Sequence, residues 1–250
     1  MNDQICWVSG ASAGIGRAAV ERFAQAGARV LAIARRQQRL AELEQRFPNQ
    51  VRALAVDVTD LPALGAALQG LEEPWSAPTL LLNNAGAAFG LGLAQSAPWE
   101  DWQKMVDLNV TSLMFLTHFV LPGMVARNRG HILQLGSVAG TYPYKGGNVY
   151  GACKAFVEQF SLNLRCDLLG TRVRVTNIEP GAVHTEFSEV RFQGDKDRAA
   201  QVYQGFQPIT AEDVAESIFW CANLPAHVNI NRLEMMPVAQ VPAGFVWHRE

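Results

Sequence analysis

Three side chains in the middle of the sequence could carry out acid–base chemistry on a hydroxyl or carbonyl group. Tyr150 and Lys154 are four positions apart, so they share one face of a helix. An ammonium group beside a phenol stabilises the phenolate, and we expect Lys154 to lower the pKa of Tyr150 toward neutrality. Ser137 ends a short apolar run upstream and could hold the same oxygen. Tyr-x-x-x-Lys alone is a common surface pair, so its surroundings must support an acid–base site.

A glycine-rich turn near the start of the chain could hold a dinucleotide. Residues 9–16 read Ser-Gly-Ala-Ser-Ala-Gly-Ile-Gly and stand between an apolar run and a helical pattern. Glycines allow the backbone to approach a pyrophosphate, which free N–H groups of the next helix can bind. Tight turns collect glycine for other reasons, so the place between a first strand and a first helix is the stronger signal. The residues expected to contact the coenzyme here are Gly10, Ser12, Gly14, Ile15 and Gly16.

The residues after the second and third apolar runs favour NADP over NAD. An NAD site carries an acid about twenty residues beyond the glycine turn. This chain has Arg35 and Arg36 there and no acid before Glu42. Two guanidinium groups suit the 2′-phosphate of NADP, although they could instead be a solvated helix start. Asp57 and Val58 could contact the adenine, or Asp57 could be an ordinary turn residue.

Two further residues stand at the end of the fourth apolar run. The sequence there is Asn-Asn-Ala-Gly over residues 83–86. The side-chain amide of Asn84 can bond backbone groups that separate at this point, and Gly86 permits the close approach of a coenzyme.

The elements that must position these residues form a regular pattern. Apolar runs of strand length recur, and most are nearly continuous, as in parallel strands buried on both faces. They are residues 5–8, 28–34, 51–56, 79–82, 131–135, 173–178 and 229–235. Helix-length segments separate them, one of which has a Thr-x-x-Asp start signal at Thr210. The pattern predicts an α/β fold with a Rossmann-like, doubly wound parallel sheet of about seven strands. We expect a single domain, residues 1–250, with ligands beyond the carboxyl ends of the strands.

Two segments are expected to cover or extend this sheet. The helical segment 102–126 is apolar nearly all round, so we expect it to be covered on both sides, either by the sheet and a partner subunit or within one chain. Residues 186–205 are polar and charged, and we expect them to form a lid over the substrate. Within the lid, Arg191 could clamp a substrate carboxylate or could simply be solvated.

The composition excludes several function classes. The 250 residues carry a formal net charge of −2, which leaves no basic excess for nucleic acid or anionic lipid. The first residues lack the features of a signal peptide, and polar residues and a proline interrupt the most apolar stretch, 113–125. The four cysteines have neither the spacing of a metal site nor that of a disulfide framework. We therefore expect a cytoplasmic protein that binds a small molecule, with no metal, nucleic acid or membrane.

The motifs together resemble those of the short-chain dehydrogenases/reductases over essentially the whole chain. The matching residues are Gly10, Gly14 and Gly16, the segment 83–86, Asn109, Ser137, Tyr150, Lys154, Pro180, Gly181, Val183 and Thr185. Segments 121–125, 146–151, 224–231 and 233–237 are similar to those of NADP-dependent 3-hydroxy acid dehydrogenases, a group that acts on serine, allo-threonine and malonic semialdehyde. The resemblance implies an NADP(H)-dependent oxidoreductase that forms a homotetramer.

The resemblance also implies a role for each matching residue. Tyr150 would exchange a proton with the substrate oxygen that Ser137 holds, and Lys154 would bind the nicotinamide ribose. Asn109 would hold a water that relays protons to Lys154. Coenzyme contacts would come from Pro180, Gly181, Val183 and Thr185, the last of them to the nicotinamide carboxamide. Hydride would pass directly between coenzyme and substrate, so positioning would matter more than covalent help.

Two departures from the family pattern and three rival functions accompany this resemblance. Ser9 stands where the family usually has Thr, and Cys153 where it usually has Ser or Thr. Cys153 could be oxidation-sensitive or a buried structural thiol. A non-catalytic NADP(H)-binding sensor could share the fold, as could a reductase of another small ketone or aldehyde. A nucleotide-sugar epimerase would need a larger substrate domain than this chain supplies.

Overall fold

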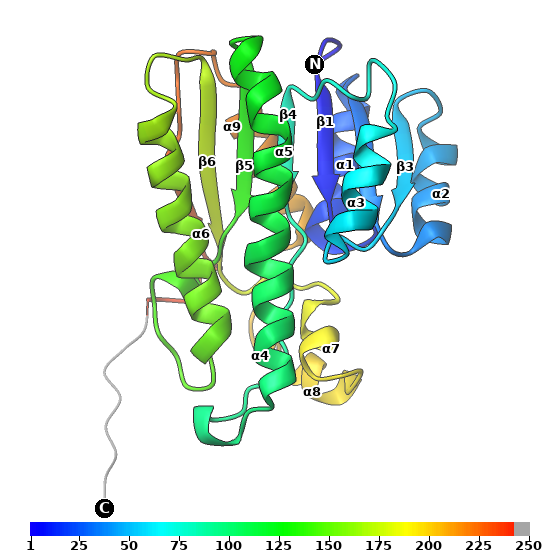
Figure 1. Ribbon diagram of the computed structural model, residues 1–250. Helices are drawn as coiled ribbons and strands as arrows, with labels where there is room; N and C mark the ends of the chain where they lie inside the picture. The colour runs from blue at the N-terminus through cyan, green and yellow to red at the C-terminus, as the bar shows by residue number, and fades with distance from the viewer. Residues whose placement is uncertain (243–250) are drawn as a thin grey trace, which may run out of the picture.

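Seven parallel strands form the sheet that the apolar runs predict. The computed structural model describes residues 1–242, and in it every pair of neighbouring strands is parallel, in the order β3-β2-β1-β4-β5-β6-β7 (Figure 1). The strands are β1 (Ile5–Ser9), β2 (Arg29–Ala34), β3 (Val51–Ala55), β4 (Leu80–Asn83), β5 (Gly130–Leu135), β6 (Val173–Pro180) and β7 (Arg232–Met235). The predicted α/β class, Rossmann-like arrangement and strand number are confirmed. The strand order reverses between β1 and β4, which is where such sheets bind ligands.

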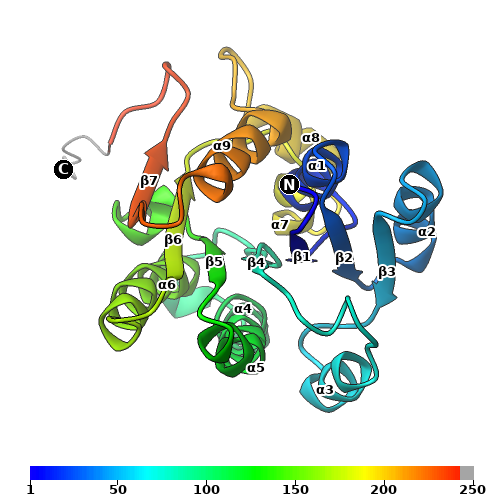
Figure 2. The same cartoon turned by 90° about the horizontal axis from the view of Figure 1, so that it is seen from above.

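Helices cover both faces of the sheet (Figure 2). One face packs against α1 (Gly14–Gln25), α2 (Gln37–Arg46) and α9 (Ala211–Asn223). The other packs against α3 (Leu61–Gln69), α5 (Ser112–Ala126) and α6 (Asn148–Asp167). Along β1, Cys6 and Val8 join the first core while Trp7 joins the second, so every residue of this strand is buried. Burial on both faces explains why the strands read as continuous apolar runs.

The start signal at Thr210 is confirmed as a capping box. The Thr210 hydroxyl accepts a hydrogen bond from the Asp213 backbone N–H at 3.1 Å, and the Asp213 carboxylate accepts one from the Thr210 backbone N–H at 2.9 Å. These two bonds satisfy N–H groups that the start of a helix leaves free. The helix α9 therefore begins where the sequence predicts.

The long apolar helix begins before the predicted segment, 102–126. It runs without a break from Trp99 to Ala126, through α4 (Trp99–Val106), a π-helical turn (Asp107–Thr111) and α5, although Pro122 lies inside it. By length and composition alone it could cross a membrane, a test that the core helix of a soluble protein also passes. The polar residues and the proline that interrupt the apolar stretch therefore lie within the helix without breaking it. Its inner face packs on the sheet through Leu116, Val120 and Met124.

Candidate active site

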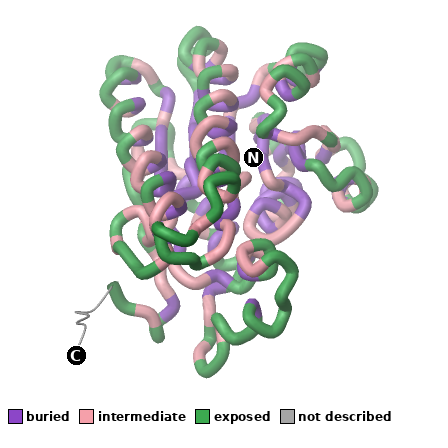
Figure 3. The backbone as a smooth tube through the Cα atoms, turned by 60° about the horizontal axis from the view of Figure 1, so that its bottom comes forward, coloured by how far each residue is buried: buried purple, intermediate pink, exposed green. Residues whose placement is uncertain are grey.

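A cleft of about 1010 Å³ opens at the carboxyl ends of the strands. These ends lie at the lower end of the sheet in Figure 1. Figure 3 shows buried segments in the middle of the molecule and more exposed segments around them. Nearly all of the predicted site residues line this cleft: Gly10, Ser12, Gly14, Ile15, Arg35, Arg36, Asp57, Val58, Asn84, Gly86, Ser137, Tyr150, Lys154, Pro180, Gly181, Val183, Thr185 and Arg191. Gly16 and Asn109 lie behind the lining and support it.

The glycine-rich turn leaves no room for side chains. Gly10 and Gly14 have φ angles of +67° and +50°, a region that favours glycine. A Cβ atom at Gly16 would lie 2.4 Å from both the Asn84 amide nitrogen and the Gly10 carbonyl oxygen. Among residues 1–242 no side chain caps the start of α1, so its first N–H groups are available to an anion. The turn has the form of a phosphate cradle.

The Asn84 side chain joins the ends of β1 and β4, as predicted. Its Nδ2 donates to the Ser9 carbonyl oxygen at 2.9 Å. The Ser9 hydroxyl in turn accepts from the backbone N–H groups of Asn84 and Ala85, both at 3.0 Å. These bonds hold the two strands at the point where they separate, and so they fix the floor of the cleft.

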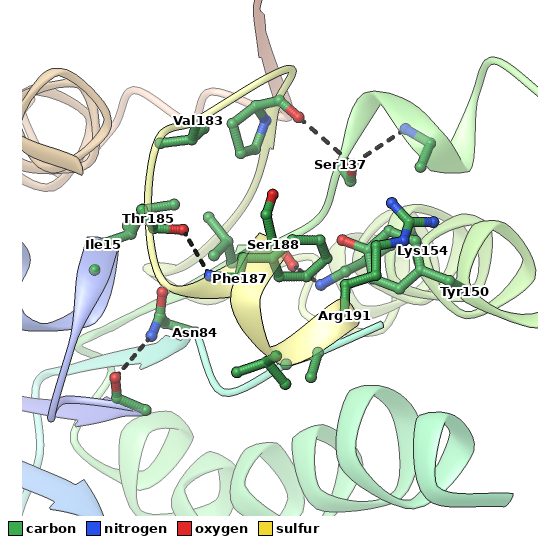
Figure 4. Close-up of a pocket in the computed structure, with 18 of the residues that line it drawn as sticks. Ile15, Asn84, Ser137, Tyr150, Lys154, Val183, Thr185, Phe187, Ser188 and Arg191 are labelled. Atoms are coloured by element: carbon green, nitrogen blue, oxygen red, sulfur yellow. Dashed lines mark hydrogen bonds between the residues drawn. The ribbon is translucent and has the colours of Figure 1, made fainter. Parts of the chain in front are cut away.

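Ser137, Tyr150 and Lys154 lie together at the other end of the cleft (Figure 4). The Ser137 hydroxyl follows β5 and accepts from the Ala139 N–H at 3.1 Å, which fixes its orientation. Tyr150 and Lys154 are both buried on α6, with the Lys154 nitrogen 5.7 Å from the Tyr150 ring centroid. The Lys154 ammonium also donates to the Leu135 carbonyl oxygen at 2.7 Å. The structure thus brings together the three residues that the sequence suggested.

The expected effect of Lys154 on Tyr150 was wrong. Burial raises the pKa of the Tyr150 hydroxyl, and the neighbouring Tyr144 adds to the rise, while Ser137 and Arg191 oppose it. Burial also lowers the pKa of Lys154 to about 8. Both shifts have one cause, because removing a charge from water is costly for an anion and for a cation alike. In this structure Tyr150 is a phenol that keeps its proton at neutral pH.

Asn109 fits its expected role as a holder of water. Its Nδ2 donates to the Ala87 and Met105 carbonyl oxygens, both at 2.8 Å, while its buried Oδ1 has no partner among residues 1–242. A Cβ atom at Gly86 would lie 2.7 Å from this oxygen and 3.4 Å from the Lys154 nitrogen. Gly86 therefore keeps open a space between the two groups. An unpaired buried oxygen beside such a space is a natural partner for water.

Arg191 lies at the substrate end of the cleft. It is the last residue of α7 (Phe187–Arg191), and its guanidinium is 5.8 Å from the Tyr150 ring centroid. Its Nη2 donates to the Tyr144 hydroxyl at 2.6 Å and its Nε to the Gly90 carbonyl oxygen at 3.2 Å. Within the described residues, no carboxylate forms an ion pair with it. Arg191 is thus a positioned cation that can still take an anion.

Comparisons with known proteins agree with this geometry. The family model described as "short chain dehydrogenase" matches residues 4–196. The chain belongs to the short-chain dehydrogenase family. It is 52 % identical to the NADP-dependent 3-hydroxy acid dehydrogenase YdfG of Escherichia coli K12, over 98 % of this chain and 100 % of that protein. It is 46 % identical to the serine 3-dehydrogenase of Rhizobium radiobacter, over 97 % of each.

A solved structure is similar over nearly the whole chain as well. The closed form of a serine dehydrogenase complexed with NADP⁺ has a TM-score of 0.97 and 52 % identity, and the match covers 99 % of this chain and 100 % of that one. The seven-stranded sheet described above is therefore that of a short-chain dehydrogenase.

The adenosine end of this short-chain dehydrogenase holds one residue that the sequence analysis missed. Arg36 donates to the Ser12 hydroxyl at 3.0 Å, and Arg35 lies 3.7 Å from an Asp57 oxygen. Arg39, one helical turn beyond Arg36, binds the same carboxylate as Arg36, that of Glu186. Helical spacing could have revealed it. The Asp57 carboxylate accepts from the Thr59 N–H at 3.0 Å and hydroxyl at 2.8 Å, the contacts of a turn residue.

Residues of the segment 186–205 and of the end of the described chain also line the cleft. Within 186–205 the chain forms two short helices, α7 and α8 (Lys196–Gln201). The Gln240 side chain accepts from the Ala182 N–H at 2.8 Å. This contact joins residues 58 positions apart, and no local sequence signal could have revealed it.

Cys153 is buried beneath Tyr150 in the same helix. Only 3 % of its surface is exposed, and burial raises the pKa of its thiol. Oxidation requires an accessible thiolate, so these observations favour the structural reading over the oxidation-sensitive one.

A cluster of charges around the buried Glu179 lies behind the Ser137 loop. The Glu179 carboxylate, at the end of β6, is 2.7 Å from the Arg232 guanidinium. Arg232 also binds Glu158 and Glu234, at 3.0 Å and 2.7 Å. Burial and the charge of Glu158 raise the pKa of Glu179 to about 7, against the pull of Arg232. The strand that carries Pro180 and Gly181 into the cleft thus ends on a group that titrates near neutrality.

We expect this cluster to make stability depend on pH. The pKa of Glu179 is higher in the folded than in the unfolded chain, so its stabilising effect is complete below about pH 4.5 and is lost as pH rises through about 7. Such a shift corresponds to at most about 3 kcal/mol of unfolding free energy. Urea unfolding of the wild type and Glu179→Gln at pH 5 and pH 8 measures it. The wild type should lose stability at pH 8 that the variant keeps, and an equal loss in both would contradict the assignment.

Proposed function

We propose that the protein is an NADP(H)-dependent oxidoreductase that transfers a hydride between the coenzyme and a small 3-hydroxy acid or its carbonyl counterpart. One observation carries the proposal: Ser137, Tyr150 and Lys154 meet at one end of a cleft whose other end is the glycine-rich turn. A cleft that joins an acid–base group to a dinucleotide cradle suits hydride transfer at a hydroxyl carbon. The relatives named as 3-hydroxy acid and serine 3-dehydrogenases support the substrate class.

The residues present fit NADP(H). The turn around Gly10, Gly14 and Gly16 excludes side chains and presents the uncapped start of α1, as a pyrophosphate requires. Arg36 and Arg39 supply guanidinium groups for a 2′-phosphate at the adenosine end. When bound, NADPH supplies a hydride donor and NADP⁺ a hydride acceptor. Thr185 lies over the same cleft, and we place the carboxamide contact there, as the family pattern implies.

In reduction, the chain's own residues deliver a proton to the substrate oxygen. The raised pKa of Tyr150 keeps its hydroxyl protonated at neutral pH, which is the form that a general acid needs. Ser137 holds the same oxygen. The hydrogen bond from the Ala139 N–H already orients the Ser137 hydroxyl for this contact. Lys154 lies between Tyr150 and the space beside Asn109, so a water there could return a proton from solvent. In oxidation the same groups run in reverse, and Arg191 is the cation that pulls the pKa of the Tyr150 hydroxyl toward the phenolate.

A substrate panel tests this function. NADPH oxidation is measured with small aldehydes, ketones and keto acids, and NADP⁺ reduction with serine, allo-threonine and 3-hydroxyisobutyrate. We expect higher kcat/KM for acids, including malonic semialdehyde, than for neutral compounds of the same size. Tight NADPH binding without turnover of any carbonyl compound would instead favour a coenzyme sensor, and a preference for neutral ketones would favour a general reductase.

Three broader expectations join this proposal. We place the enzyme in the cytoplasm, as a homotetramer, with residues 186–205 as a lid. The outer side of the long helix supports an assembly, because Val106, Met114 and Val125 are exposed there. Light scattering should give four times the chain mass of 27.4 kDa. A monomer at working concentration would contradict the tetramer.

A further inference from the structure

One carboxylate at the start of the lid joins two arginines of the adenosine end. Glu186 directly precedes α7, and its Oε2 lies 2.7 Å from the Arg36 Nη1. Its other oxygen, Oε1, binds the Arg39 Nη1. Each oxygen therefore takes a separate guanidinium, the arrangement by which two arginines bind a phosphate. Burial raises the pKa of Glu186, but the hydrogen bonds from Arg39 and Arg36 lower it below its usual value.

The charges at this end of the cleft cannot satisfy both Glu186 and a phosphate. Three arginines, at positions 35, 36 and 39, face two carboxylates, Asp57 and Glu186. The surplus is one positive charge, whereas a phosphate monoester carries about −1.5 to −2 at pH 7. With Glu186 in place, an incoming 2′-phosphate would meet a like charge at close range. With Glu186 released or neutral, the surplus of two charges would match the phosphate.

We propose that Glu186 is a coenzyme-specificity residue that occupies the place of the 2′-phosphate and gives up Arg36 and Arg39 when NADP(H) binds. The inference rests on the proposed function, because it requires the coenzyme to carry that phosphate. NADH has no 2′-phosphate and leaves the two ion pairs intact. Glu186 is also the residue that begins the lid, so the exchange transmits the presence of the phosphate to α7.

The proposal predicts that a change at Glu186 affects the binding of ligands with a 2′-phosphate and not of ligands without one. We compare Glu186→Gln, which keeps the size and removes the charge, with Glu189→Gln, an exposed acid of α7 outside the cleft lining. The ligands are NADPH, NADH, adenosine 2′,5′-bisphosphate and AMP, with Kd measured by fluorescence or calorimetry. Glu186→Gln should bind NADPH and the bisphosphate roughly three- to tenfold more tightly, since two exposed ion pairs no longer compete. Binding of NADH and AMP should be unchanged, and Glu189→Gln should resemble the wild type throughout.

The outcomes separate this inference from the proposed function. If the wild type prefers NADPH to NADH but Glu186→Gln leaves that ratio unchanged, the inference is wrong and the function stands. Weaker binding of NADPH by Glu186→Gln would also overturn the inference, since Glu186 would then position the arginines for the phosphate. A wild type with no preference for NADPH would overturn the proposed coenzyme, and the inference with it.

Discussion

Replacing Tyr150 by phenylalanine should lower kcat by about 10²- to 10⁴-fold, the usual contribution of a general acid or base. The variant keeps the buried ring and its contact with Phe187, whose centroid lies 5.5 Å away, and it removes only the hydroxyl. Because the ring is a packing group and the hydroxyl is the acid, we expect NADPH to bind as it does to the wild type. Initial rates of NADPH oxidation and the fluorescence of bound NADPH measure the two effects separately.

Tyr142 also lines the cleft and serves as a control, because its hydroxyl is already bound to a carboxylate of the chain. Its hydroxyl donates to the Glu234 carboxylate at 3.2 Å, so Tyr142→Phe loses a hydroxyl that faces the charge cluster around Arg232. This variant should turn over at the wild-type rate. Undiminished turnover in Tyr150→Phe would contradict the acid role, and loss of NADPH binding in the same variant would mean that the change had damaged the cleft itself.

Replacing Arg191 by alanine should raise KM for acidic substrates by about 10- to 100-fold, the value of a hydrogen bond to a charged group. Arg191 is held by Tyr144 and Gly90, lies beside Tyr150, and has no carboxylate partner among residues 1–242. A carboxylate one or two carbons from the reacting oxygen would meet it. Neutral aldehydes of the same size should show almost no change in KM. The comparison needs initial rates for one acid and one neutral substrate at saturating NADPH.

Two further variants sharpen this prediction. Tyr144→Phe keeps the ring but removes the hydroxyl that accepts from Arg191, so it should raise the same KM by a smaller factor, about threefold. Arg198→Ala removes a lid arginine outside the cleft lining, which lies against the Phe192 ring, and should change neither KM. Equal effects of Arg191→Ala on acidic and neutral substrates would mean that Arg191 holds the lid rather than the substrate.

Most of the fold was predictable, because its signals are local. A strand buried on both faces must be apolar along its length, so the runs of the five central strands appear in the sequence as the structure places them. The edge strands β3 and β7 are less buried. The first βα turn needs glycine at Gly10 and Gly14, where φ is positive. The start of α9 needs a capping residue, and Thr210 supplies it. Each of these requirements acts within a few residues.

The relation between Tyr150 and its neighbours could not be predicted in the same way. Helical spacing correctly placed Lys154 on the face of Tyr150. The direction of the pKa shift, however, depends on how far the two groups are removed from water, and that follows from packing of the whole sheet and its helices. Charge proximity predicted a lowered pKa, and burial outweighs it.

The sequence by itself determined the fold class, the coenzyme turn and the residues of the acid–base site, because these depend on periodicity, turn geometry and helical spacing. Only the tertiary structure decided which partners the charged side chains of the cleft meet. Arg36 and Glu186 are 150 positions apart, and Arg191 and Gly90 are 101 apart. Such pairs form when the loops at the carboxyl ends of distant strands come together, and no local pattern encodes that distance. The local sequence thus established the reaction site, whereas long-range packing arranged the charges that would select coenzyme and substrate.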